Sequence, residues 1–169
     1  MKIIKLTSLI IIILLIGNSS CYSQTPSLQE TEKFIKQSLE DYPWTEGIAI
    51  NYIDFEDTNG DRIMKIHQYS KVLEMPSLGE MNSYYEFKVA ELQSVTFEMN
   101  EVNIWVILFF KENKYSKHYQ KELNTNEQVN KITIYLGNSA KTDDIPARLK
   151  KAFDSYLYQI TGVKKSTAY

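Results

Sequence analysis

Few side chains in this sequence are of the kinds that bind metals or act as catalytic bases. The 169 residues include two histidines, His67 and His118, and one cysteine, Cys21. A zinc site needs three or four converging ligands, and a nucleophilic triad needs a base beside its nucleophile. The two histidines fall in different predicted strands without paired spacing, so we expect each to lie at the surface or rim. The sequence therefore predicts no catalytic triad, no metal site and no bound cofactor.

Oxygen-bearing side chains leave two further possibilities. Asp, Asn and Asp alternate at positions 57, 59 and 61 as in the first half of a calcium loop, but Gln68 stands where a twelve-residue EF-hand needs a bidentate acid. Asp54 and Glu56 share one face of a predicted strand, and glycoside hydrolysis needs only two carboxylates. A carboxylate-based hydrolase therefore remains an alternative, although acidic residues are common on any solvated strand.

Aromatic residues give the clearest indication of a binding surface. The chain has twelve tyrosines, seven phenylalanines and two tryptophans. Tyrosine offers a large amphipathic contact area at low entropic cost, but it is also a good strand former. The tyrosines that we consider for a binding rim are Tyr84, Tyr85, Tyr115, Tyr119, Tyr156 and Tyr158. Among them we single out Tyr115 and Tyr119, on a predicted edge strand, as a possible binding edge.

The first residues predict export. Lys2 and Lys5 precede an eleven-residue stretch at positions 6–16 of which nine residues are apolar, which is the pattern of a signal peptide and is shorter than the ~20 residues of a membrane span. Two processing routes are open. In one, residues 1–20 are removed and Cys21, preceded by Ser20, becomes the lipid-bearing first residue. In the other, a signal peptidase cuts after Ser23 and removes residues 1–23.

Composition is typical of one globular domain. With 43% hydrophobic residues, 24% charged residues and a net charge of -2, the chain has no basic face for nucleic acid and no polybasic stretch for anionic lipid. We predict a tether at residues 21–27, a domain at 28–162 and a tail at 163–169. We expect an exported, periplasmic protein, which in the lipidation route touches the membrane only through a lipid on its N-terminus.

Two helices and about seven strands must position these side chains. Ser27 and Glu30 predict a capping box at the start of a helix that ends near Pro43. Strands are predicted at residues 47–55, 62–69, 84–91, 95–99, 102–110, 115–121 and 129–136. Asn59-Gly60 predicts a tight hairpin turn. Residues 102–110 are apolar on both faces, which indicates a central strand.

A second, longer helix is predicted at about residues 145–160. Asp143 and Asp144 stand at its start, Pro146 in its first turn and Gly162 at its end. The order of helix, strands and long amphipathic helix resembles the pleckstrin-homology-like barrel over about residues 47–162. This resemblance implies an α+β, mostly antiparallel fold, as a barrel or a strongly bent sheet. The alternative is a flat antiparallel sheet with helices on one face.

A second resemblance concerns the two ends of the chain. Residues 145–153 and the Ser-Ser-Cys-Tyr-Ser-Gln start look like those of small uncharacterised bacterial exported proteins, which implies no activity. Inositide-binding pleckstrin-homology domains carry basic residues in the first hairpin, whereas Glu56, Asp57 and Asp61 stand here. The sequence favours a non-enzymatic binding or interaction module, whose partner is a protein or small ligand of the envelope. An inhibitor or immunity-type protein is a further alternative.

Overall fold

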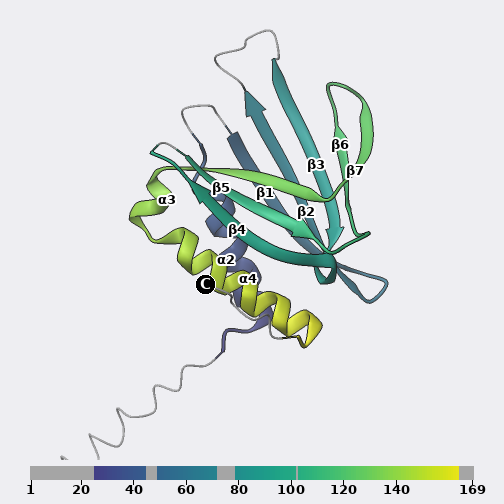
Figure 1. The fold of residues 1–169 in the computed structure, drawn as a ribbon, viewed down its shortest axis with the longest axis vertical. Helices are drawn as coiled ribbons and strands as arrows, with labels where there is room; N and C mark the ends of the chain where they lie inside the picture. Colours follow the sequence, from purple (N-terminus) through teal and green to yellow (C-terminus); the bar gives the residue numbers. More distant parts are fainter. Residues whose placement is uncertain (1–24, 45–48, 72–78, 102, 164–169) are drawn as a thin grey trace, which may run out of the picture.

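The computed structural model describes residues 25–44, 49–71, 79–101 and 103–163 (Figure 1). Cys21 and both predicted cleavage sites lie outside the described residues. The helices are α2 (Leu28–Glu40), α3 (Ser139–Thr142) and α4 (Ile145–Thr161), with a 3₁₀ turn at Val89–Glu91. Among the described residues, no helix combines the length and the apolar composition that crossing a bilayer requires.

Eight described strands form two antiparallel sheets. The larger sheet has the order β1-β2-β3-β6-β7, with bounds β1 (Ala49–Thr58), β2 (Asp61–Lys71), β3 (Glu80–Lys88), β6 (Ser116–Gln120) and β7 (Thr125–Val129). The smaller sheet has the order β4-β5-β8, with bounds β4 (Leu92–Met99), β5 (Asn103–Phe110) and β8 (Lys131–Gly137). The predicted α+β, mostly antiparallel class is confirmed.

The described strands do not close into a barrel, so the barrel expected from the resemblance is not confirmed. Where β8 meets the larger sheet, side-chain amides replace a backbone ladder. Asn51 Nδ2 donates to the carbonyls of Tyr135 (3.1 Å) and Leu39 (3.2 Å), and Gln68 Nε2 donates to Asn51 Oδ1 (3.2 Å). Because a side-chain amide joins strands at single points, the two sheets are tied here without sharing a continuous ladder.

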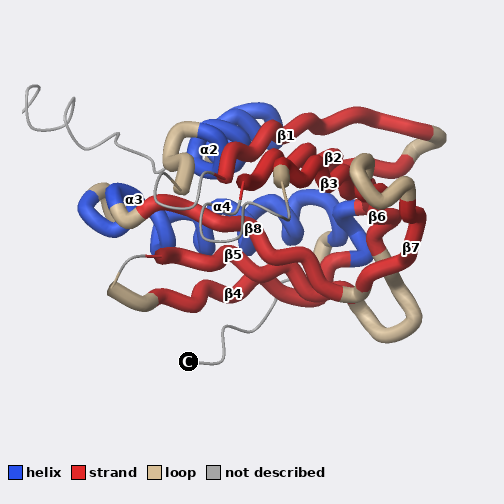
Figure 2. Tube along the Cα trace, turned by 90° about the horizontal axis from the view of Figure 1, so that it is seen from above, coloured by secondary structure: helices blue, strands red, loops and turns tan. Residues whose placement is uncertain are grey.

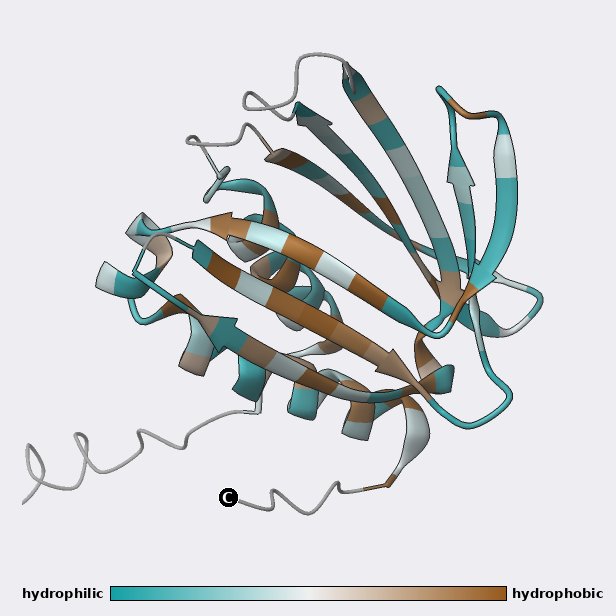
Figure 3. Ribbon diagram, turned by 45° about the horizontal axis from the view of Figure 1, so that its top comes forward, coloured by the Kyte–Doolittle hydropathy of each residue, from teal (hydrophilic) through white to brown (hydrophobic). Residues whose placement is uncertain are grey.

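The apolar core lies between the two sheets and the helices. Figure 2 shows β1 and β4 on opposite sides of the molecule, with β8 and α4 between them. Fully buried side chains come from all these layers and include Ile35, Leu39, Ile53, Met64, Leu108, Ile134 and Phe153. β5 is the middle strand of its sheet, as predicted, and is the most uniformly apolar strand in Figure 3.

A buried ion pair fastens α2 to β2 and α4. Glu32, which is 7% exposed, accepts hydrogen bonds from Arg62 Nε (2.6 Å) and Nη2 (2.5 Å). The hydroxyl of Tyr156 donates to Glu32 Oε1 at 2.6 Å. Burial and the neighbouring carboxylate both disfavour the phenolate, so the pKa of Tyr156 is raised far above its usual value. Tyr156 is a core residue, and its predicted place on a binding rim is wrong.

The predicted signals at the helix ends are confirmed with one exception, whereas several strand ends differ from the prediction, as in β3, which spans Glu80–Lys88 instead of residues 84–91. Ser27 Oγ accepts from the backbone N–H of Glu30 (3.2 Å), and the Glu30 carboxylate accepts from Ser27 N–H (2.8 Å), as a capping box requires. Gly162 ends α4 with a φ of 67°. Asp144, however, makes no side-chain capping bond, and Asp143 accepts a hydrogen bond from a tyrosine hydroxyl.

The sequence does not predict β7, and it therefore predicts β6 as the edge strand in its place. β7 pairs with β6 on the side away from β3, so the prediction that residues 115–121 form an edge strand is wrong. The first four residues of β7, Thr-Asn-Glu-Gln, are exposed and polar. A strand with no apolar alternation leaves no period-two pattern to detect.

Candidate functional site

One face of the larger sheet, which we call the outer face, points away from the core. The strand register brings four of its rings side by side across β1, β2, β3 and β6. This aromatic row consists of Tyr52, His67, Tyr84 and Tyr119. Successive ring centroids are 5.4, 4.3 and 6.1 Å apart. The row is therefore continuous over four strands.

The rings of this row stack on one another rather than lying on the sheet. His67 and Tyr84 are nearly parallel, with 9° between their planes, and Tyr52 is tilted by 25° from His67. Because neighbouring rings occupy each other's π-faces, the ring edges remain for a ligand to contact. Tyr52 and Tyr84 are nevertheless 54% and 37% exposed. The result is a wall of rings that support each other at the surface.

Hydrogen bonds also hold His67. Its Nε2 lies 3.0 Å from Asn82 Oδ1, and Asn82 in turn donates from Nδ2 (2.6 Å) and from its backbone N–H (2.7 Å) to the Glu122 carboxylate. These two donors lower the pKa of Glu122, the backbone donor most strongly. Because Asn82 Nδ2 is committed to Glu122, Asn82 Oδ1 must accept from His67. Nε2 therefore carries the proton, and Nδ1 is an acceptor in the neutral ring.

A charged row runs parallel to the aromatic row and is displaced from it by two residues along each strand. It consists of Asp54, Lys65, Glu86 and Lys117, whose charges alternate across the sheet. Lys117 Nζ lies 2.8 Å and Lys65 Nζ lies 4.0 Å from the Glu86 carboxylate. Lys65 also donates to Glu56 at 2.7 Å, which lowers the pKa of Glu56. The row is therefore largely compensated within itself.

A groove of about 1360 Å³ runs between the two rows, across the strands. Its floor is the backbone of the register positions between them, namely Ile53, Ile66, Tyr85, His118 and Glu127. Asn126 and Gln128 of β7 extend the two walls. Compact ligand pockets usually measure about 300–1,000 Å³, so this groove suits an elongated ligand better than a small molecule.

The helix α2 borders one end of the groove. Lys36 Nζ donates to the carbonyl of Ile53, and the backbone N–H of Ile53 donates to Glu40 Oε1, each at 2.6 Å. These bonds satisfy the outward-facing backbone groups of β1 at this position. An added strand therefore has no free partner at Ile53.

The structure separates the two predicted binding-edge residues. Tyr119 belongs to the aromatic row, whereas Tyr115 precedes β6 and is not among the described residues that line the groove. The sequence analysis missed Tyr52 and His67 as site residues. Their pairing had a signal, because a two-residue turn that pairs residues 58 and 61 also sets 52 opposite 67.

His118 differs from its expected place at the surface. It is only 9% exposed, its ring stacks on Tyr85 with centroids 4.5 Å apart, and its Nδ1 lies 2.7 Å from Glu127 Oε1. Its Nε2 has no hydrogen-bond partner in the described part of the chain. No group of three or more metal-ligating side chains occurs among the described residues.

Comparisons with known proteins give no relative. No protein-family model, no curated protein and no solved structure matches this chain. The outer face is therefore the main basis for a functional proposal.

Proposed function

We propose that this protein is a non-enzymatic binding module of the cell envelope that holds its ligand or partner in the groove of the outer face. The observation that carries the proposal is that His67, within the aromatic row, is held in one orientation. The rings of Tyr52 and Tyr84 stack on its two sides, and Asn82, which is itself hydrogen-bonded to Glu122, contacts its Nε2. Immobilising exposed side chains before binding reduces the entropy lost on binding, which favours affinity.

The acids beside the groove support binding more than hydrolysis. Asp54 and Glu56 share the outer face of β1, but Lys65 holds Glu56 as an ionised carboxylate by lowering its pKa. A glycosidase needs one carboxyl with a raised pKa to protonate the leaving group. The carboxylate hydrolase is thus the less favoured alternative, and it is tested by looking for cleavage of a bound ligand.

In the inhibitor alternative, the groove binds a segment of a toxic enzyme.

The envelope location rests on the N-terminal sequence. Residues 9–16 are all apolar, and the single cysteine follows them at position 21. Replacing it, Cys21→Ala, and measuring the mass of the mature terminus separates the two routes. Loss of a lipid-bearing terminus supports lipidation, whereas an unchanged terminus at Gln24 supports cleavage after Ser23. The resemblance to pleckstrin-homology-like exported proteins remains part of this proposal, limited to the order of the elements.

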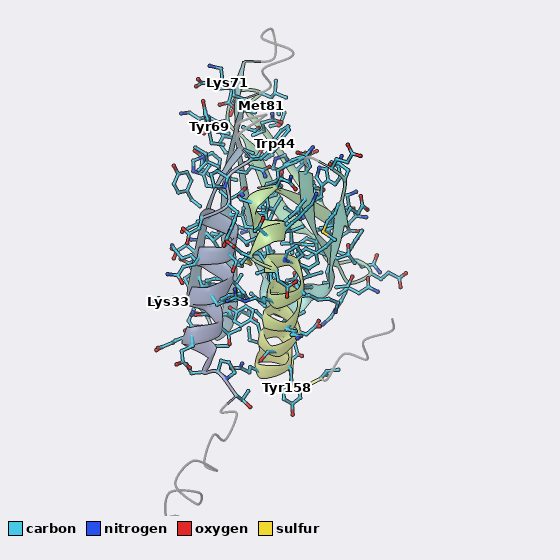
Figure 4. All side chains as sticks on the ribbon, turned by 90° about the vertical axis from the view of Figure 1, so that its left-hand side faces the viewer. Lys33, Trp44, Tyr69, Lys71, Met81 and Tyr158 are labelled. Carbon is cyan, nitrogen blue, oxygen red and sulfur yellow. The ribbon has the colours of Figure 1, made fainter. Side chains whose placement is uncertain are left out.

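Photo-crosslinking in cells tests the binding site itself. A benzoylphenylalanine at position 84 lies in the aromatic row, and one at position 158 is a matched control. Tyr158 is 51% exposed and lies near the far end of α4, away from Tyr69 and Met81 in Figure 4. We expect an adduct from position 84 and none from position 158. Equal adducts from both positions, or none from position 84, contradict the proposal.

A further inference from the structure

We propose that the groove binds a linear, uncharged oligosaccharide in an extended conformation. This inference rests on the proposed binding function and names the chemical class of its ligand. Four properties of the groove carry it: the spacing of its polar groups, the alternation of donors and acceptors, the balance of its charges and the state of its floor.

The spacing of the polar groups follows the strands. Neighbouring strands lie ~4.8 Å apart, so the charged row presents one polar group at each such step over five strands, a length of ~19 Å. An extended chain of β-1,4-linked pyranoses repeats at a similar interval. In an extended peptide, side chains on one side recur only every ~6.6 Å, so their spacing does not match the ~4.8 Å spacing of the strands.

The hydrogen-bonding pattern alternates between acceptors and donors. Asp54 and Glu86 accept, whereas Lys65 and Lys117 donate. Gln128 at the end of the row can do both. A sugar hydroxyl is itself donor and acceptor, so successive sugar units can satisfy this alternation in any register. On the opposite wall, His67 adds an acceptor at Nδ1, because Asn82 holds the proton on Nε2.

The charges of the groove favour an uncharged ligand. Its charged lining residues are Lys36, Lys65, Lys117, Glu40, Asp54, Glu86 and Glu127. Most are already neutralised by a neighbour, as Glu86 is by Lys117 and Glu40 by Lys36. A polyanion or polycation gains little from a surface whose charges are balanced.

The floor of the groove excludes strand addition as the mode of binding. Ile66 and Tyr85 are paired within the sheet, and the backbone groups of Ile53 are bonded to Lys36 and Glu40 of α2. A peptide that lies across the strands therefore finds no free ladder of backbone partners, which is its usual source of affinity. Recognition depends on side chains, as it does for a ligand rich in hydroxyl groups.

Titration with defined probes, followed by two-dimensional amide NMR, tests the inference. The probes are the β-1,4-linked hexasaccharides of glucose, N-acetylglucosamine and mannose at millimolar concentration, with a glycine–serine hexapeptide for comparison. We expect at least one hexasaccharide to shift the amides of the floor residues Ile53, Ile66, Tyr85 and His118. No shift with any hexasaccharide, or a stronger effect of the peptide, overturns the inference.

Variants assign the effect to the groove. Asp54→Ala and His67→Ala remove one recognition group from each wall, and we expect each to weaken hexasaccharide binding at least about tenfold. Tyr158→Ala is the matched control and should bind like the wild type. If His67→Ala unfolds, Asp54→Ala at an exposed position keeps the test valid. Unchanged binding by a folded variant overturns the inference.

The results also separate this inference from the proposed function. Adducts from position 84 without hexasaccharide binding overturn the oligosaccharide and leave the binding module standing. Hexasaccharide binding followed by chain cleavage, seen by chromatography of the products, supports the oligosaccharide and contradicts the non-enzymatic function. Shifts that map away from the groove overturn the oligosaccharide, and crosslinking from position 84 then decides the proposed function by itself.

Discussion

The two sheets of this protein use the same antiparallel pairing for different purposes. In the smaller sheet, β5 is packed along its length, and Ile104, Val106 and Leu108 are almost completely buried. In the larger sheet, the inner face joins the core, whereas the outer face carries the exposed rings of Tyr52 and Tyr84. Figure 3 shows this contrast as a mostly hydrophobic β5 against the mixed colours of the larger sheet. The buried faces thus supply stability, whereas the proposed recognition surface lies on the outer face, and changes on one should leave the other largely intact.

The largest expected effect is in the core of the smaller sheet. Leu108→Ala removes a side chain that is 0% exposed, so it should lower the free energy of unfolding by about 3–5 kcal/mol through lost burial and a new cavity. Urea denaturation measures this change. Leu123→Ala is the control, because Leu123 is 66% exposed. Similar losses in both variants contradict the contrast.

The second effect concerns the buried ion pair. Glu32→Ala should cost about 2–4 kcal/mol of unfolding free energy, because it takes the bidentate carboxylate partner from the mostly buried Arg62 and leaves it beside the exposed Asp57 and the Tyr156 hydroxyl. Tyr156→Phe removes one hydrogen bond and should cost about 1 kcal/mol. Calorimetric or denaturant unfolding of both variants tests the order. A Glu32→Ala protein as stable as the wild type refutes it.

The third effect concerns the point where the two sheets meet. Asn51→Ala leaves the carbonyls of Tyr135 and Leu39 and the amide of Gln68 without their partner. We expect a loss of about 1–3 kcal/mol, since buried polar groups are left unsatisfied. Asn126→Ala, at an exposed position of β7, should change stability by less than about 0.5 kcal/mol. Equal effects imply that Asn51 does not join the sheets.

A smaller effect on stability is expected on the outer face. Tyr84→Ala should cost only about 0.5–1 kcal/mol, because the ring is partly exposed and makes cross-strand contacts alone. The same change should abolish ligand contacts in the groove. Thermal unfolding and crosslinking from position 52 measure the two quantities separately. A loss of stability as large as that of Leu108→Ala would contradict the contrast, because the outer face would then contribute as much to stability as the core.

The smallest effect is a local dependence on pH. The pKa of Glu122 is lowered in the folded state by the backbone and side-chain N–H groups of Asn82. The stability that the hydrogen bonds between Asn82 and the Glu122 carboxylate contribute is therefore fully present above the unfolded pKa of about 4.3. It is lost as pH falls through the lower folded pKa. Glu122→Gln should lack this local transition. Amide NMR of Asn82 across an acid titration measures it, and an unchanged Asn82 signal down to the folded pKa contradicts it.

Local sequence signals predicted several elements well. The Ser27–Glu30 capping box, the turn at Asn59 (φ 53°) and Gly60 (φ 81°) and the start and end of α4 were found because each depends on residues near each other in the chain. β7 was missed because its exposed, polar residues carry no alternation. The missed strand also explains the wrong edge assignment for β6.

The groove was predicted only in part, because its residues come from five strands. Tyr52 and His67 are paired by one local hairpin, so their contact was accessible from the sequence. Tyr84 and Tyr119 are joined by a pairing between β3 and β6, with β4 and β5 of the smaller sheet between them in the chain. No local signal specifies that register. Tyr115 was grouped with Tyr119 by sequence alone, yet only Tyr119 enters the row.

The amino-acid sequence by itself determined the two long helices α2 and α4 but not the short α3, and it determined most strands, the hairpin turn and the mostly antiparallel class, because these depend on short-range periodicity and backbone preference. Only the tertiary structure decided that the strands form two sheets, that Tyr156 and His118 are buried, and that the aromatic and charged rows lie side by side. These outcomes depend on which distant strands pair and in which register. That choice is made by the packing of the whole core, which no single segment encodes.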